Sequence, residues 1–486
     1  MKKVIAFILA SIIAFSLIGC QKKGGDLNIN GQKDTQTSPV PETGTSQDSQ
    51  VPSADDNAST DDSDPAVWTE NTVVTEKMFV YFYNSYYRHF VETHKADLAD
   101  IGLDPSKSLS EQLQSENCTW QQYMTVQVFD QLREMMALAD GAKAAGITFT
   151  EEDTKNIANQ MNTYSMYAMN SGMSVDTYLE KAYGKGVNAA AVESALELRL
   201  LANKYYEHIK SLCTFTDEEC AEYYGENEED FLHFNCISVT LPNEEVSALT
   251  AATDEESFIA ALRDAVTKSY YEDDYDKFSE AIEAAVKRSY SYGNLIDRDS
   301  ELGRWLLEEG RAPFNIYTEA TGEENTTVTM LLPSADGEAL YKNETITENF
   351  YYMVFKDGEG FESTTKAETI YKNWSEEPTL ERFEKLCSQY GGSLAADVSV
   401  GGSTEALNEW IFDPARAAGD CSVIEGDGCT YLLYMLEEGD PAWLVEVRGF
   451  LASTALTEEI KALTDACSPE YNESYVYNVV EVSVKA

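Results

Sequence analysis

The chain has 486 residues, enough for two to four domains with several hydrophobic cores. Its 85 acidic residues outnumber its 35 basic ones, and the formal charge of −50 repels nucleic acid and anionic membrane surfaces. Apolar residues make up 43% of the chain, so most of it is expected to fold. The charge fits a highly soluble exported protein, and an acidic surface that attracts basic polypeptides is the alternative.

The first twenty residues predict export. Met1 to Lys3 form a basic start, and the uncharged, mostly apolar run Val4 to Ile18 follows. A helix of that run rises only ~22 Å, short of a ~30 Å bilayer core. The run ends in "LIGC", which resembles the bacterial lipobox. Residues 1–19 are therefore predicted to be a cleaved lipoprotein signal peptide and Cys20 a lipid-modified N-terminus, with an uncleaved anchor as the alternative.

Residues 20–72 are predicted to be a disordered tether behind the lipidated cysteine. Ser, Thr, Asp, Gln, Gly and Pro dominate this segment, and apolar residues are nearly absent. Such a composition buries too little apolar surface to offset the entropy of ordering the chain. About fifty flexible residues have a reach of roughly 40 Å, which would hold a folded body clear of the membrane.

From residue 73 to residue 230 the pattern is helical. One helical face carries Val128, Leu132, Met135, Ala139 and Ala142. The segments "TEED" at Thr150 and "TDEE" at Thr216 have the spacing of capping boxes, which start helices. Because no alternating strand pattern interrupts the stretch, an all-helical domain is predicted over residues 73–230.

Two stretches of this domain are rich in aromatic or sulfur side chains. "FVYFYNSYYRHF" at 79–90 favours core packing, with a binding wall as the alternative. "NQMNTYSMYAMNSGM" at 159–173 groups flexible, polarisable side chains, which suit a surface for varied partners, with core packing as the alternative. The candidate residues for binding unfolded polypeptides are Met161, Tyr164, Met166, Tyr167, Met169 and Met173.

After residue 230 one sequence pattern occurs twice. "LGRWLLEEGRAPFN" at 302–315 and "LNEWIFDPARAAGD" at 407–420 share Leu, Trp and Arg, each pair 105 residues apart. The tryptophan helices are expected to pack on a sheet, and Arg311 and Arg416 to bond carbonyls of the turn that follows. In each copy a strand, two helices and a turn precede the tryptophan helix, and a strand follows it.

In the first copy the expected strands are "FLHFNCISVTL" and "NTTVTMLL", and "YSYGN" is the expected turn. In the second copy they are "NFYYMVF" and "CTYLLYM", with "YGGS" as the turn. Two small α+β modules are thus predicted over residues 231–336 and 337–440. Residues 441–486 are predicted to form a C-terminal helix and strand, which could pack back on the helical domain.

The segment "WIFDPARAAGD" and its module order resemble parvulin-type peptidyl-prolyl isomerase domains. The helical stretch, with "TWQQYM" at 119–124, "SVDTYLEKAYGKG" and "TFTDEECAEYYGEN", resembles the chaperone domain of PrsA-like and SurA-like exported folding factors. The resemblance implies an α+β multidomain protein, an all-helical SurA-like chaperone domain followed by two parvulin-like modules. It also implies an ATP-independent chaperone or foldase for unfolded exported polypeptides, lipid-anchored at the outer face of the bacterial cytoplasmic membrane.

The isomerase chemistry that the resemblance implies depends on two facing histidines. An X–Pro bond rotates over a barrier of ~18–20 kcal/mol, and a catalyst must favour the twisted amide. The positions that match the family histidines are Tyr352 and Tyr431 in the second copy, and Cys236 and the neighbourhood of Val328 in the first. The chain's four histidines are His89, His94, His208 and His233, and neither copy can assemble the pair.

The modules are therefore expected to be degenerate, with Tyr352 and Tyr431 as candidate catalytic residues if activity persists. The family's Asp or Cys lies nearest Cys387 or Ser388, and its pocket Phe falls on Leu407 and Leu302. An active peptidyl-prolyl isomerase is the first alternative function. A solute-binding lipoprotein, with two α/β lobes and parallel sheets, is the second.

No motif for nucleotide binding, zinc proteolysis or serine hydrolysis occurs, so no cofactor and no metal site are predicted. The eight cysteines after Cys20 contain no C-x-x-C pair and are expected to be buried thiols. Disulfides are the alternative outside the cytoplasm. The sequence fixes neither their pairing nor the clients, meaning the unfolded polypeptides bound, nor the oligomeric state.

Overall fold

The computed structural model describes residues 63–269, 275–356, 363–400, 404–426 and 428–482. Within them the chain is a mixture of helix and sheet, as the predicted α+β class requires. The described residues divide into two compact units, one with residues 63–214 and 452–482 and the other with the described residues between 215 and 451. No helix among the described residues has the length and hydropathy needed to cross a membrane. The predicted signal peptide and the predicted lipidation site Cys20 lie outside the described residues.

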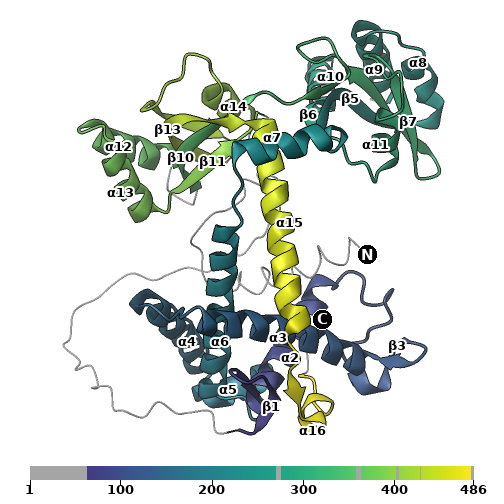
Figure 1. The fold of residues 1–486 in the computed structure, drawn as a ribbon. Coiled ribbons are helices and arrows are strands. Elements are labelled where there is room, and N and C mark those ends of the chain that lie inside the picture. The colour runs from purple at the N-terminus through teal and green to yellow at the C-terminus, as the bar shows by residue number, and fades with distance from the viewer. Residues whose placement is uncertain (1–62, 270–274, 357–362, 401–403, 427, 483–486) are drawn as a thin grey trace. The chain divides into compact units, whose positions relative to one another are not determined.

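The first unit is mainly helical (Figure 1). Its helices are α2 (Glu76–Thr93), α3 (Trp120–Ala144), α4 (Glu151–Asn170), α5 (Val175–Tyr183), α6 (Ala189–Leu212), α16 (Glu473–Val476) and the 3-10 turn η1 (Leu109–Glu111). Helix α3 packs along α6, and α2 contacts both. A Cβ on Gly141 of α3 would lie 2.2 Å from the Tyr205 ring of α6, so glycine permits this close crossing.

Short strands also occur in this unit, so the prediction of an all-helical stretch over 73–230 is wrong in detail. The pairs are β1 (Pro65–Trp68) with β2 (Val73–Thr75) and β14 (Glu470–Tyr471), and β3 (Leu113–Ser115) with β4 (Cys118–Thr119). Strands of two to four residues are too short to show an alternating pattern. The predicted tether also ends too late, because Ala66 and Val67 are fully buried.

Aromatic side chains of α2 fill the core of the first unit. Phe79, Tyr83 and Tyr87 are fully buried, in agreement with the core prediction for residues 79–90. The end of the chain belongs to this unit as well: Leu456 and Ile460 pack in one cluster with residues of α3 and α6. Both predicted capping boxes, at Thr150 and Thr216, are confirmed by reciprocal side-chain bonds.

The second unit contains two antiparallel sheets. The first sheet has the order β6-β5-β8-β7, with β9 also paired to β5, and the second has the order β11-β10-β13-β12. The strands are β5 (Leu232–Pro242), β6 (Tyr290–Leu295), β7 (Ile316–Thr321), β8 (Asn325–Leu332), β9 (Leu340–Lys342), β10 (Ile346–Lys356), β11 (Ser393–Val398), β12 (Cys421–Gly426) and β13 (Cys429–Pro441).

The second unit also contains the helices α7 (Asp217–Glu226), η2 (Glu228–Asp230), η3 (Asn243–Glu245), α8 (Val246–Thr250), α9 (Glu255–Ser269), α10 (Tyr275–Ser289), α11 (Glu301–Leu306), α12 (Ser363–Ser375), α13 (Leu380–Tyr390), α14 (Glu405–Ile411) and the beginning of α15 (Ala442–Ala466). In the first sheet α9 packs on one face and α11 on the other. In the second sheet α12 and α13 pack on one face and α14 on the other (Figure 1).

Every expected strand of the two modules is present, but five further strands, β6, β7, β9, β11 and β12, were not predicted. "YSYGN" forms β6 rather than a turn, and β7, β9, β11 and β12 were missed. All but β9, which adds to β5, are the outer strands of the two sheets, with many half-buried or exposed residues. Because outer strands face the core weakly, their apolar alternation is weak.

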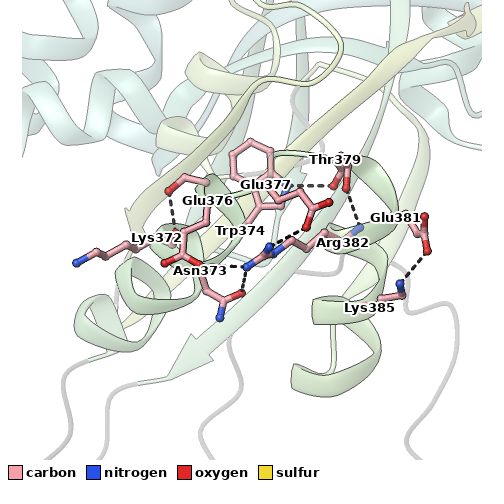
Figure 2. A network of polar contacts seen from close by, with 10 residues as sticks. Lys372, Asn373, Trp374, Glu376, Glu377, Thr379, Glu381, Arg382 and Lys385 are labelled. Atoms are coloured by element: carbon pink, nitrogen blue, oxygen red, sulfur yellow. Dashed lines mark hydrogen bonds and ion pairs between the residues drawn. The ribbon is translucent and has the colours of Figure 1, made fainter.

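A polar network fixes the corner between α12 and α13. Arg382 donates from Nη1 to Glu377 at 3.1 Å and from Nη2 to Asn373 at 3.0 Å. The Trp374 indole donates to the backbone carbonyl of Thr379 at 3.1 Å, and Thr379 caps α13 (Figure 2). The two helices therefore cover their face of the sheet as one piece. The corresponding corner between α9 and α10 lies outside the described residues.

Candidate functional site

The repeated tryptophan and arginine form the same local structure twice. Arg311 Nε donates to the backbone carbonyl of Trp305 at 2.6 Å, and Arg416 Nε to that of Trp410 at 3.1 Å. The guanidinium carbons lie 3.9 and 4.4 Å from the centroids of the same tryptophan rings. The expected partner, a carbonyl of the following turn, is therefore wrong. The arginine satisfies the last turn of the helix that precedes it in the chain, where carbonyls run short of helical partners.

The last residue of each repeated segment, Asn315 or Asp420, ties the helix to the sheet. The side chains of Asn315 and Asp420 accept from the backbone N–H of Ala312 and Ala417 at 3.2 and 3.1 Å. Their backbone carbonyls accept from Leu331 of β8 and Met435 of β13 at 2.9 and 2.8 Å. The residue just before, Phe314 or Gly419, has a positive φ in both copies. These bonds make Leu331 and Met435 equivalent positions.

The α14 face of the second sheet brings the two candidate catalytic tyrosines together. Tyr352 of β10 is the register partner of Leu433, and Tyr431 of β13 is the partner of Val354. Both tyrosines contact the cluster around Trp410. Burial, followed by contact with the Cys429 thiol and the field of Tyr352, raises the pKa of Tyr431 to about 12. Two tyrosine hydroxyl groups therefore occupy this face.

Cys429 is the residue of this site that sequence reasoning missed. It lies two residues before Tyr431 on β13, and a spacing of two on a strand puts both side chains on one face. That spacing was the available signal. The thiol expected from the sequence, Cys387, lies in the core on the opposite face with Phe383, and burial raises its pKa to about 12. Ser388 donates to the carbonyl of Glu384 instead.

The first sheet does not place Cys236 where the sequence comparison put it. Cys236 is the register partner of Leu331, whereas Phe350 is the partner of the equivalent Met435. Cys236 therefore corresponds to Phe350, two residues before Tyr352. Val328 lies in the cluster on the other face of this sheet, so it does not meet Cys236.

Small hydroxyl residues stand where the second sheet has tyrosines. By the same registers, Ser238 takes the place of Tyr352 and Thr327 the place of Tyr431. Ser238 bonds Thr329 at 2.9 Å, and Thr327 bonds Thr240 at 2.8 Å. These hydroxyl groups satisfy one another across the strands, and the α11 face of the first sheet carries neither of the second sheet's tyrosines.

The four histidines lie away from the α14 face of the second sheet and from the α11 face of the first sheet. His89 and His94 lie in and just after α2, and His208 lies in α6. His233 is buried at the start of β5, where its ring nitrogens bond the carbonyl of Gly293 at 2.7 Å and the carboxylate of Glu446 at 2.8 Å. Leu407, which matches the family's pocket Phe, is a buried core residue.

The methionine-rich stretch of α4 divides into a packed part and an exposed part. Met161 and Tyr164 pack against the core of the first unit, and Tyr164 meets the ring of Tyr183 at 6.1 Å. The exposed fractions of Met166, Tyr167 and Met169 are 55%, 52% and 72%, and Met173 is half-buried. The candidate residues therefore do not form one surface, and three of them face water.

The eight cysteines after Cys20 are thiols in the structure, and Cys220, Cys236 and Cys387 are buried. The remaining five are half-buried, which is less burial than the sequence suggested. Across the described residues, no cluster of His, Cys, Asp and Glu could hold a metal ion.

Comparison with known proteins finds similarity to solved structures only. Neither family models nor curated protein sequences match the chain. Among solved structures, the chain is similar to the foldase protein PrsA from Lactococcus lactis, whose crystal structure has a resolution of 3.10 Å. The two are 8% identical, the match covers 68% of this chain and 94% of the other, and the TM-score is 0.19. We therefore draw the function from the residues of this chain.

Proposed function

We propose that the protein is an ATP-independent chaperone or foldase for unfolded exported polypeptides, with little isomerase activity. The exposed Met166, Tyr167 and Met169 of α4 carry this proposal. A neighbouring group of large apolar side chains in water marks an interaction surface, and flexible methionines adapt to partners of different shape. In this proposal the first unit holds the SurA-like chaperone domain, and the two sheets of the second unit are parvulin-like modules kept for their shape.

A matched pair of double variants tests the proposal. The full chain should suppress aggregation of a chemically unfolded protein without ATP, and Met166→Ser with Met169→Ser should remove at least half of that effect. Val126→Ser with Leu212→Ser is the control, because these side chains are 50% and 66% exposed elsewhere in the same unit. No suppression by the unaltered chain, or equal losses in both double variants, would contradict the proposal.

The proposed location is the outer face of the bacterial cytoplasmic membrane, with the chain anchored by lipid on Cys20. The lipobox-like "LIGC" after a short apolar run supports it. Cys20→Ala should leave an unprocessed precursor or release the protein into the medium. An unchanged, detergent-extractable mature form would contradict lipidation.

An active peptidyl-prolyl isomerase is the second candidate function. The observation in its favour is the shared face of Tyr352, Tyr431 and Cys429, whose hydroxyl and thiol groups could polarise a bound amide. Val354, the register partner of Tyr431, is 38% exposed, so this end of the face is open to solvent. The solute-binding alternative has no such support, because every strand pair among the described residues is antiparallel.

A further inference from the structure

The first unit contains an open cavity of about 760 Å³ that none of the functions above uses. One stripe of α3 forms its floor, with Trp120, Tyr123, Gln127, Asp130 and Glu134 spaced alternately three and four residues apart. That spacing places side chains on one helical face. The stripe runs over ~21 Å at 1.5 Å per residue, with aromatic rings at its start and carboxyl groups at its end.

The aromatic end of the cavity is held in place by ring contacts. The ring centroid of Phe90 in α2 lies 5.7 Å from that of Trp120 and 6.3 Å from that of Tyr123. The ring centroids of Trp120 and Tyr123 are 5.5 Å apart. The Trp120 indole donates to the carbonyl of Gly102 at 3.3 Å, which fixes its orientation. A preformed aromatic wall of this kind accepts apolar side chains and the stems of cationic ones.

The acidic end carries two carboxylates without partners. Among the described residues, none forms a hydrogen bond or ion pair with Asp130 or Glu134. Arg133, which lies between them, donates instead to the backbone carbonyls of Cys467 and Asp465 at 2.8 and 3.3 Å. The Thr464 hydroxyl at the cavity wall is buried and has no partner among the described residues.

Burial raises the pKa of Glu134 from 4.5 to about 7, so ionising this carboxyl in the empty cavity costs free energy. A cation bound beside it would offset that cost and lower the pKa again. Arg133 also lines the cavity, and its charge opposes the burial that raises the pKa of Asp130. At Glu134 burial is the cause of the raised pKa, so the acidic end is suited to a further positive group beside Glu134.

We infer that this cavity binds a lysine- or arginine-bearing stretch of an unfolded polypeptide. An aromatic or aliphatic side chain of the client lies against Trp120 and Tyr123, and the cationic side chain reaches Asp130 and Glu134. About six extended residues, at ~3.3 Å each, span the stripe. The formal charge of −50 favours cationic segments over acidic ones. The inference rests on the proposed chaperone function and names the class of segment that it recognises.

Two eight-residue peptides test the inference on the full chain. One carries phenylalanine near its start and lysine four residues later, and its twin has glutamine in place of lysine. The lysine peptide should bind at least about tenfold more tightly, a difference of ~1.4 kcal/mol. Asp130→Asn with Glu134→Gln should reduce its affinity to that of the twin. Glu193→Gln, an exposed carboxylate on α6, should leave both affinities unchanged.

The pH dependence separates binding at Glu134 from a general charge effect. Affinity for the lysine peptide should rise between pH 6 and pH 8, because Glu134 ionises across this range. The other titratable or charged groups that line the cavity are Asp130, Arg133, His94, Tyr86 and Tyr123, and Tyr206 lies within the field of Glu134. Glu134→Gln should abolish the rise, and His94→Gln should keep it. Equal binding of the two peptides, or a rise lost with His94 and kept without Glu134, would overturn the inference.

Aggregation assays on the same variants distinguish this inference from the proposed function. If the chain suppresses aggregation but binds both peptides equally, the chaperone proposal stands and the cation site is refuted. If it binds the lysine peptide through Asp130 and Glu134 but suppresses no aggregation, the cavity is a cation site and the assignment of its ligand to an unfolded client is refuted.

Discussion

The first and second sheets of the second unit form an internal comparison. In both, an arginine donates to the backbone carbonyl of the helix tryptophan and covers its ring. The last residue of each repeated segment, Asn315 or Asp420, then ties that helix to a central strand. The side chains on that face differ. The second sheet presents Tyr352, Tyr431 and Cys429, whereas the equivalent positions 238 and 327 in the first hold serine and threonine.

The difference shows which parts of a duplicated module are constrained by folding. The bonds of Arg311 and Arg416 satisfy helix carbonyls and shield a large ring, so they are needed wherever the tryptophan helix must dock. Side chains along the sheet face only have to pack or to pair with one another. Two such faces can therefore diverge in chemistry while their backbones stay alike.

The largest expected effect separates the two tryptophans. Trp410 is 9% exposed, and Trp410→Ala should cost roughly 3–5 kcal/mol in free energy of unfolding. Trp305 is only half-buried, so Trp305→Ala should cost clearly less. Urea titration followed by hydrogen exchange of β8 and β13 measures the two losses separately. Equal losses would show that the two helices dock alike despite the difference in burial.

The second prediction compares the cysteines of the two faces. Burial raises the pKa of Cys236 to about 11, which leaves roughly one thousandth of it as thiolate at pH 8, while Cys429 is half-exposed. Iodoacetamide at pH 8 should therefore label Cys429 at least about a hundredfold faster, as read by peptide mass spectrometry. Cys387 is the control and should react as slowly as Cys236, since it too is buried. Similar rates at Cys429 and Cys236 would contradict the difference between the faces.

The third prediction tests what the copies share. Arg311→Met and Arg416→Met should each cost about 1–3 kcal/mol in free energy of unfolding, because a charged donor to a helix carbonyl is lost. Arg416→Lys should recover less than half, since lysine has no Nε donor at that position. Arg298→Met, which breaks an exposed ion pair with Asp230, should cost clearly less than Arg311→Met or Arg416→Met. A loss at only one repeated arginine would break the equivalence of the copies.

The smallest effect concerns the tyrosine pair. Tyr352→Phe and Tyr431→Phe should each change the free energy of unfolding by less than about 0.5 kcal/mol, because the rings stay in place. Isomerisation of a prolyl tetrapeptide should be near background for the unaltered protein and for both variants. A clear acceleration that disappears in either variant would instead assign catalysis to the second sheet alone. Ser238→Ala serves as the matched change on the first sheet.

Element prediction worked where one periodic signal was long. The stretch over 73–230 is mainly helical, with helices starting at the predicted capping boxes, and the central strands β5, β8, β10 and β13 appear at the expected places. The edge strands and the strands of the first unit could not be found, because short or half-exposed strands lack a sustained apolar alternation. For the candidate site, alternation along β13 linked Tyr431 to Leu433 and also to Cys429, but the register that pairs β10 with β13 was needed to bring Tyr352 beside them.

The sequence by itself determined the α+β class, the repeated motif 105 residues apart and the absence of a histidine pair, since each depends on residue identity and local spacing. Tertiary structure alone decided which side chains share a face. A register shift of two residues moves Cys236 out of the position of Tyr352, and the crossing of helices gathers Phe90, Trp120 and Glu134 around one cavity. Such pairings depend on long-range contacts, and neighbouring residues in the chain carry no signal of them.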